Sequence, residues 1–327
     1  MIKHESPPSL RKAIAHAEQA LEAGRAEQAE RLLRSALTPR PRAGAAAHGT
    51  HTAEGLEARG MLAACWRMRG RYRHAELLLS ATLAAAESVT GASSPTVAWL
   101  CNQAGILGKY TGDFDIAEVR YLRALEIYQE AFGPVHDTVA MVCHNLGGLA
   151  HARGDAQAGE PWAARAVQIR TRLHGAGHLL TALDTAAWAA LLDGCGRPEE
   201  AEHCLRKALA VFHDVHGPDH HDVAVTLHNL AALEHRRGEL RAAVLHYADA
   251  LRLKERLLGP DHPDLAPTLA NTAALSEAQG DTAHAQALYG RVIHLLHHRV
   301  HATHPTLTSA RAALARLAAT PDERTSR

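Results

Sequence analysis

Histidine is the residue type with the most potential chemistry in this chain, since it accounts for 25 of the 327 residues. Neutral imidazole is the commonest metal ligand in proteins and suits zinc and nickel. Near the C-terminus, His294, His298 and His301 are spaced so that a continuous helix would carry them on one face. The repeat register described below puts a joint at His301, which favours a helix end there. We therefore predict no metal or cofactor, and keep these three as the metal candidates.

The five cysteines show no metal-binding or disulfide framework. They are Cys65, Cys101, Cys143, Cys195 and Cys204, without a C-x-x-C pair. This pattern indicates small buried hydrophobes in a reducing compartment. A site built from Cys195, His203 and Cys204 lacks the usual zinc-ligand spacing.

The remaining chemistry is sparse. We find no nucleophile beside an Asp/Glu/His set and no phosphate-cradling glycine loop, so we predict that the chain is not an enzyme. Its 35 basic and 35 acidic residues balance, which argues against a nucleic-acid or anionic membrane partner. There is no apolar run of membrane-spanning length, and the first ten residues do not resemble a signal peptide. We expect a cytoplasmic protein with a protein or peptide partner.

The elements that position these residues are repeats. Six glycines recur every 42 residues, namely Gly70, Gly112, Gly154, Gly196, Gly238 and Gly280. Self-similarity at such a period is typical of a solenoid, in which each repeat contacts its neighbours and the whole offers an extended binding surface. We expect the chain to behave as one elongated unit.

Each repeat reads as a helical hairpin. We predict helix N-caps five residues into the unit, at Thr96, Thr138, Asp222, Asp264 and Thr306. In one repeat, a first helix runs from Val223 to Arg237 and a second from Glu239 to Leu258, where Gly259-Pro260 ends it.

Two columns of small residues identify the kind of hairpin. They are Ala75, Ala117, Gly159, Ala201, Ala243 and Ala285, and Thr82, Ala124, Ala166, Ala208, Ala250 and Val292. Tyr121, Tyr247 and Tyr289 follow the first column by four residues. With the pairs Leu146-Gly147 and Leu230-Ala231, this pattern resembles the tetratricopeptide repeat, although the period alone lies nearer to HEAT or armadillo units. The joints GPVHDT, GPDHHD and GPDHPD, which begin at Gly133, Gly217 and Gly259, resemble the kinesin-light-chain type over residues 49–318.

This resemblance implies an all-α, right-handed tetratricopeptide superhelix of about seven hairpins and a closing helix. We expect a degenerate N-terminal hairpin in residues 1–40, with helices at 9–23 and 26–37, and a flexible joint at 41–48. Six 42-residue units follow in 49–300. A capping helix in 301–320, from about Leu307 to Ala318, and a disordered tail at 321–327 complete the chain.

The resemblance also implies where a partner binds. In that family, two adjacent positions near the middle of the first helix face a groove and often carry Asn that holds a peptide backbone. The matching positions here are Asn102-Gln103, His144-Asn145, Ala186-Ala187, His228-Asn229 and Ala270-Asn271. Three residues earlier stand Trp99, Met141, Leu183, Val225 and Pro267, which predict an apolar strip. The alternative is that the amides hydrogen-bond within or between helices, because buried polar groups need partners in either case.

The predicted groove is neutral, since its matching positions hold no Lys or Arg. His144 and His228 would make binding pH-sensitive if they titrate near the ordinary imidazole range. The repeat at Gly175 departs from the pattern, because Leu180 replaces the cap and Ala186-Ala187 replace the amides. This departure is consistent with a wider apolar pocket in the middle of the groove, and equally with neutral sequence drift. The predicted function is an adaptor or scaffold that binds a peptide or protein segment in the groove, and the alternative is a ligand-sensing regulator.

Overall fold

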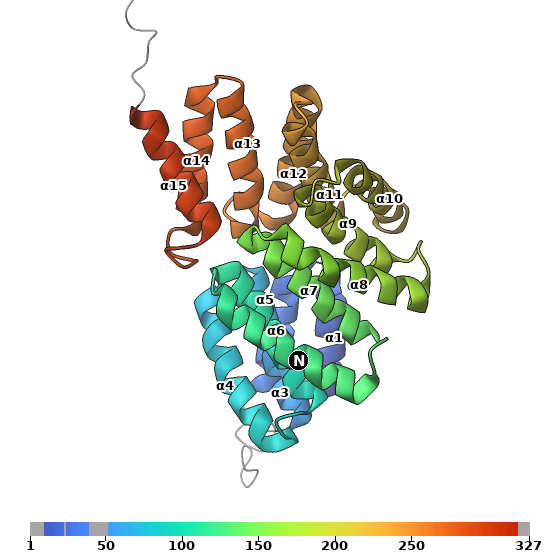
Figure 1. The fold of residues 1–327 in the computed structure, drawn as a ribbon. Helices are drawn as coiled ribbons and strands as arrows, with labels where there is room; N and C mark the ends of the chain where they lie inside the picture. Colours follow the sequence, from blue (N-terminus) through green and yellow to red (C-terminus); the bar gives the residue numbers. More distant parts are fainter. Residues whose placement is uncertain (1–9, 23, 39–51, 320–327) are drawn as a thin grey trace, which may run out of the picture. The chain divides into compact units, whose positions relative to one another are not determined.

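The computed structural model describes residues 10–22, 24–38 and 52–319 (Figure 1). Within these ranges the secondary structure is helical throughout. The predicted joint at 41–48 and tail at 321–327 lie outside the described residues. The chain divides into two compact units, residues 1–134 and 135–327. The boundary between the two units falls in a repeat joint, just after Gly133. The sequence predicts one elongated unit instead.

Paired helices form each unit. The first unit contains the hairpins α1 (Leu10–Glu22) with α2 (Ala26–Leu37), α3 (Ala53–Met68) with α4 (Tyr72–Thr90), and α5 (Pro95–Thr111) with α6 (Phe114–Phe132). The second contains α7 (Asp137–Arg153) with α8 (Ala156–His174), α9 (Leu179–Gly194) with α10 (Pro198–His216), α11 (His221–Arg236) with α12 (Leu240–Leu258), and α13 (Ala266–Ala278) with α14 (Thr282–Leu296). A 3-10 turn, Pro263–Leu265, precedes α13, and α15 (Pro305–Ala319) follows α14. The seven hairpins and the closing helix are confirmed.

Glycines end the helices. From Gly70 to Gly280 a glycine with positive φ recurs every 21 residues, so the 42-residue column has a partner column half a period away. Gly112 closes α5 in the left-handed region, at φ 92° and ψ 11°. Gly259 closes α12 at φ 89° and ψ 159°, a backbone region that essentially only glycine occupies. The first column turns the chain within a hairpin, and the second turns it between hairpins.

The predicted N-caps are wrong by two residues. The side chain of His136 caps α7 by accepting the backbone N–H of Thr138 at 3.2 Å, and His220 caps α11 by accepting that of Asp222 at 3.3 Å. His178 and His262 do the same at their joints, and Ser94 caps α5. The chain is extended at each capping residue, so Thr96, Thr138 and Asp222 already lie in the first helical turn. Four histidines therefore have a structural role, with Nδ1 as the acceptor.

The small-residue columns form the contact between paired helices. Every residue of both columns is buried, and so are Tyr121, Tyr247 and Tyr289. In the second unit, each first helix also contacts the first helix of the next hairpin, along the series α7, α9, α11 and α13. The second helices of successive hairpins contact one another less. These four first helices are called the inner layer below. Side chains from adjacent hairpins can therefore meet on this layer.

We predict that one substitution has opposite effects at two glycines. Neither Gly259 nor Gly290, which lies inside α14, has an atom within 4 Å of the position of an added Cβ. Gly259→Ala should lower the free energy of unfolding by about 1–3 kcal/mol through backbone strain alone. Gly290→Ala should raise it by roughly 0.5–1 kcal/mol through helix propensity. Urea unfolding of both variants provides the measurement, and a loss at Gly290 equal to that at Gly259 would contradict the assignment.

Candidate functional site

A pocket of about 250 Å³ opens on the inner layer of the second unit. We call it the inner pocket. Its polar lining consists of His151, Asp193, His228, Asn229, Arg236 and Asn271, and its apolar lining of Ala189, Ala190, Ala201, Leu205, Ala232 and Leu233. Three residues that the sequence predicts as groove residues, His228, Asn229 and Asn271, thus come together from α11 and α13.

His228 has an unusual environment. Its Nδ1 atom is buried and has no hydrogen-bond partner among the described residues, and its ring lies 5.7 Å from the Tyr247 ring. Burial lowers the pKa of His228 well below its usual value, and the nearby Lys254 and His151 lower it further. His228 therefore stays neutral near pH 7, in contrast to the pH sensor that the sequence predicts. A neutral imidazole can both donate and accept a hydrogen bond.

The amides of the pocket differ in their partners. Asn271 hydrogen-bonds the Tyr247 hydroxyl, whose pKa burial raises to about 12. This contact agrees with the alternative stated in the sequence analysis, in which the amides of the first helices form hydrogen bonds within or between helices. Asn229 lies half-buried on the pocket wall. The pocket therefore combines one amide engaged inside the fold with one at its surface.

An ion pair in the pocket lining was missed by the sequence analysis. Asp193, in the last turn of α9, pairs with Arg236 at the end of α11. Burial lowers the pKa of Arg236. The pocket thus carries a matched pair of charges in addition to the predicted amides and imidazoles. The two residues are 43 positions apart and do not share a register position, so the repeat pattern alone does not pair them.

The other predicted groove residues of the second unit lie outside the inner pocket. His144 Nδ1 is 2.9 Å from Oδ1 of Asp184, and Asn145 is buried. Met141, Leu183 and Val225 are half-buried on the same layer.

In the first unit, the predicted groove residues are partly in the core. Asn102 is fully buried, whereas Gln103 is half-buried. Trp99 packs over Gly60, where an added Cβ would lie only 2.2 Å from the indole ring. The amide of Asn102 therefore serves the interior rather than an open surface.

A buried ionic cluster supports the inner layer at α7 to α9. Arg170 of α8 pairs with Asp137, and its Nε lies 3.4 Å from Oδ2 of Asp184, the carboxylate that also contacts His144. Asp184 lies in the repeat that departs from the sequence pattern. The cluster thus places a buried acid on the inner layer where the amide column is interrupted.

The same positions recur two repeats later with different chemistry. Lys254 stands 84 residues after Arg170, Thr268 stands 84 after Asp184, and His228 stands 84 after His144. Lys254 is 5% exposed, and its ammonium donates to Oγ1 of Thr268 at 2.9 Å. No carboxylate forms an ion pair with it in the described part of the chain. Burial therefore lowers its pKa to about 8.

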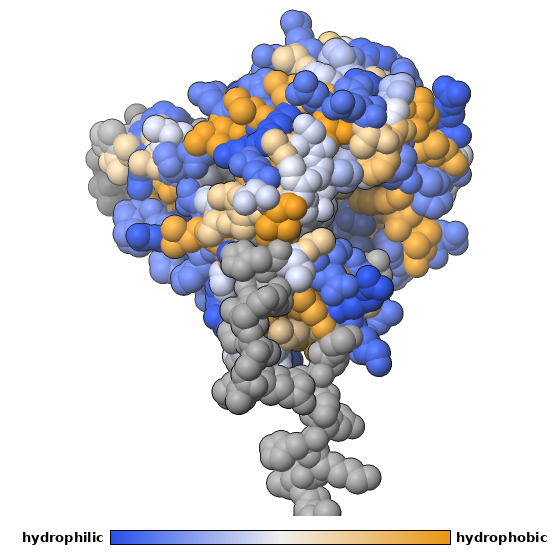
Figure 2. Space-filling view, turned by 90° about the horizontal axis from the view of Figure 1, so that it is seen from below, coloured by the Kyte–Doolittle hydropathy of each residue, from blue (hydrophilic) through white to orange (hydrophobic). Residues whose placement is uncertain are grey.

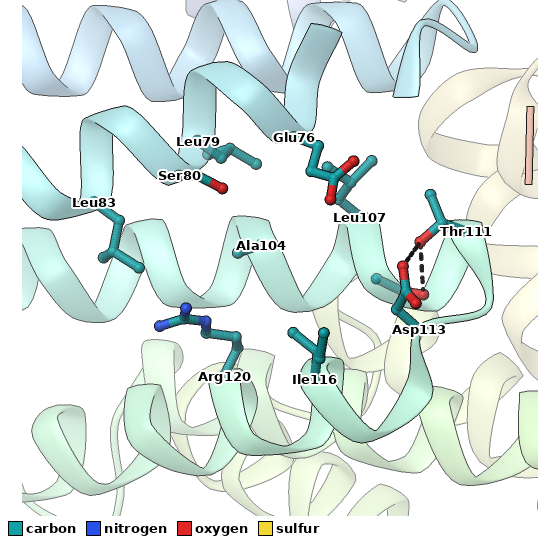
Figure 3. Close-up of a pocket in the computed structure, with 11 residues that line it drawn as sticks. Glu76, Leu79, Ser80, Leu83, Ala104, Leu107, Thr111, Asp113, Ile116 and Arg120 are labelled. Carbon is teal, nitrogen blue, oxygen red and sulfur yellow. Dashed lines mark hydrogen bonds between the residues drawn. The ribbon is translucent and has the colours of Figure 1, made fainter. Parts of the chain in front are cut away.

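A second pocket, of about 200 Å³, lies in the first unit between α4, α5 and α6. Figure 3 shows Leu79, Leu107 and Ile116 at this pocket, and the Thr111 hydroxyl donates to Asp113 at 3.0 Å. Ile116 is one of several exposed large apolar residues on second helices. On the face drawn in Figure 2, apolar residues form separate groups among hydrophilic ones. None of the predicted groove residues lines this second pocket.

The C-terminal histidines do not share one helical face. α14 ends at Leu296, so His298 and His301 lie beyond the helix that carries His294. The repeat joint thus ends the helix, as its register indicates. In the residues that the structure describes, no helix combines the length and apolar character needed to cross a membrane.

Comparisons with known proteins agree with this architecture. Tetratricopeptide repeat profiles match residues 97–137, 139–180 and 185–256. No curated protein sequence matches the chain. The chain is a tetratricopeptide repeat protein.

Three solved structures illustrate the likeness. Rap protein complexed with Competence and Sporulation Factor has a TM-score of 0.65 and 13% identity, covering 94% of this chain and 85% of that one. NprR in complex with its cognate peptide NprX has a TM-score of 0.62 and 14% identity, covering 96% and 84%. BtubC (BKLC) from P. vanneervenii has a TM-score of 0.50 and 21% identity, covering 77% and 93%. At these identities the likeness shows the fold.

We predict that the two buried cations respond differently to substitution by Met. Lys254→Met should preserve or raise the free energy of unfolding at pH 7, by up to about 2 kcal/mol, because it removes a buried charge without a carboxylate partner. Arg170→Met should lower it by about 3–5 kcal/mol, because the buried carboxylate of Asp184 loses its guanidinium partner and keeps only the imidazole of His144. Urea unfolding of both variants at pH 7 gives the comparison.

The pH dependence of the free energy of unfolding shows whether the buried charge of Lys254 causes this difference in stability. Its pKa is about 8 in the folded protein and 10.5 in the unfolded reference. The unfolded chain therefore binds more protons between these values, and wild-type stability rises with pH across this window. Any advantage of Lys254→Met should shrink from pH 8 to pH 10. A constant difference, or a loss as large as that of Arg170→Met, would show that Lys254 is not a strained charge.

We also predict that His228 makes folding sensitive to acid. Its pKa in the folded protein is below the ordinary value of 6.5, so the unfolded chain binds more protons as the pH falls below about 6.5, and stability is lost there. His228→Gln should reduce this slope, which reaches at most about 1.4 kcal/mol per pH unit for one proton. Thermal unfolding between pH 5 and pH 7 measures it, with the exposed His213→Gln as control. Equal slopes in the two variants would refute the assignment.

Proposed function

We propose that this chain binds a peptide or protein segment on the inner layer of its second unit, with the inner pocket as the anchoring point. The observation that carries the proposal is the convergence of His228, Asn229 and Asn271 on one cavity from two successive repeats. Pockets that bind ligands are typically mostly apolar with a few convergent polar groups. The alanine and leucine walls and these polar side chains fit that description.

The chemistry of the pocket suits one side chain of an extended segment. Its volume of about 250 Å³ is too small for a folded element. Asn229 offers both a donor and an acceptor, which can pair with a peptide group whatever side chain that residue carries. The Arg236–Asp193 pair neutralises itself, so an uncharged anchoring side chain is favoured over an acidic or basic one.

Two of the structural neighbours support this reading. Rap protein was solved with Competence and Sporulation Factor, and NprR with its cognate peptide NprX. The same neighbours favour the second candidate function, a peptide-sensing regulator rather than a passive adaptor. A regulator should change its compactness when the peptide binds, which small-angle scattering measures, whereas an adaptor need not.

The test uses peptides selected by display against the tag-free full-length chain. Ala232→Trp should fill the inner pocket and weaken binding of the selected peptides by more than about tenfold. Asn229→Ala should weaken it by about fivefold, the value of one hydrogen bond near 1 kcal/mol. Fluorescence anisotropy measures the affinities.

Matched controls come from exposed positions on the second helices of the hairpins, which are called the outer helices. Ala210→Trp on α10 and Gln157→Ala on α8 make the same chemical changes away from the pocket, and should leave binding unchanged. Selected peptides that bind Ala232→Trp as tightly as wild type, or a selection that yields no binder, would contradict the proposal.

A further inference from the structure

Three metal-ligating side chains meet at the joint between α10 and α11. Nε2 of His216 lies 3.7 Å from Oδ2 of Asp222, and Nδ1 of His220 lies 3.4 Å from the same oxygen. Nδ1 of His220 also accepts the Asp222 N–H at 3.3 Å, and a bound ion would replace that hydrogen bond. The three donor atoms all lie within 4.8 Å of one another. Ligands at about 2.0–2.1 Å from a tetrahedral zinc ion are separated by roughly 3.3 Å. Two of the three separations are thus already within a few tenths of an ångström of that value.

The local fold holds these groups in place. His216 is the last residue of α10, His220 caps α11, and Asp222 lies in the first turn of α11. The two imidazole rings stack with centroids 3.9 Å apart and an angle of 19° between their planes, so one ring must turn before both nitrogens coordinate the same ion. The side chains of all three residues are between 21% and 32% exposed, so they are ordered by packing and can still be reached by an ion from solvent.

The equivalent positions of the other joints show that His216 and the Asp222 carboxylate are not needed for a histidine to cap a helix. The corresponding trios at the other joints are Thr90, Ser94 and Thr96; Phe132, His136 and Thr138; His174, His178 and Leu180; and Leu258, His262 and Asp264. His136 caps α7 without a histidine or an acid at the other two positions. Capping therefore requires neither His216 nor the Asp222 carboxylate. Among the described residues, this joint alone brings three such metal-binding groups together.

We propose that His216, His220 and Asp222 form a zinc-binding site. Two imidazoles and one carboxylate are a known zinc ligand set, and they leave a fourth position for water or a ligand from a partner. Zinc would link the end of α10 to the start of α11. The site is separate from the inner pocket and does not depend on the proposed function.

The test measures zinc binding to tag-free, chelator-stripped full-length protein. Zinc is titrated in competition with a chromophoric chelator, and Co²⁺ serves as a spectroscopic probe of tetrahedral coordination. The variants copy residues from the joint two repeats earlier: His216→Phe reproduces Phe132, and Asp222→Thr reproduces Thr138. Both keep the His220 cap, and circular dichroism verifies that they fold. The control, His174→Phe, alters a similar stacked pair of imidazoles that has Leu180 at the position of Asp222, although His174 contacts Asp137 instead.

We expect wild type and His174→Phe to bind one zinc ion at the joint with equal affinity, and each of the other two variants to bind it at least tenfold more weakly. The tetrahedral Co²⁺ bands should be lost in both, and zinc should raise the melting temperature of wild type but not of these variants. Zinc that binds all four proteins alike would belong to other histidines and would overturn the proposal. So would equal losses in His174→Phe and His216→Phe.

Discussion

The structure depends on a backbone constraint that repeats every 21 residues. At each of these points the chain must leave a helix through a positive φ, and each position holds glycine. At Gly259 the required conformation is closed to other residues. Because the helix ends are set this way, the small residues of one helix always meet those of its partner. Within each unit, the same constraint brings each first helix into contact with the first helix of the following hairpin.

This register explains why polar residues 84 positions apart occupy comparable places. Arg170 with Asp184 and Lys254 with Thr268 are two versions of one contact between a second helix and the next first helix. In the first version the charges satisfy each other. In the second, the lysine has a hydroxyl as its partner and lowers the pKa of His228, which borders the inner pocket. The inner layer therefore combines an ionic part with a part whose imidazole is kept neutral.

The sequence was sufficient to predict the hairpins, the glycines that end their helices and their buried columns, because periodicity and glycine placement are local properties. It predicted the wrong capping residues, since both Thr138 and His136 are able to cap and only the backbone conformation decides between them. Through the register it predicted His228, Asn229 and Asn271 as groove residues, and these three residues line one pocket. It could not predict that Asn271 bonds Tyr247 or that Asp193 meets Arg236, because these contacts depend on side-chain directions between helices. The cluster of His216, His220 and Asp222 was not predicted, because the sequence indicated only a capping role for Asp222 and does not show which side chains meet at a joint.

The central claim is that the inner layer of the second unit is the surface on which a peptide segment binds. Hydrogen–deuterium exchange with and without a bound peptide tests this claim most directly, because it reports on every helix in one experiment. The account predicts added protection in α9, α11 and α13, around the inner pocket, and little change in α8 and α14. Protection confined to the outer helices, or to the first unit, would contradict it.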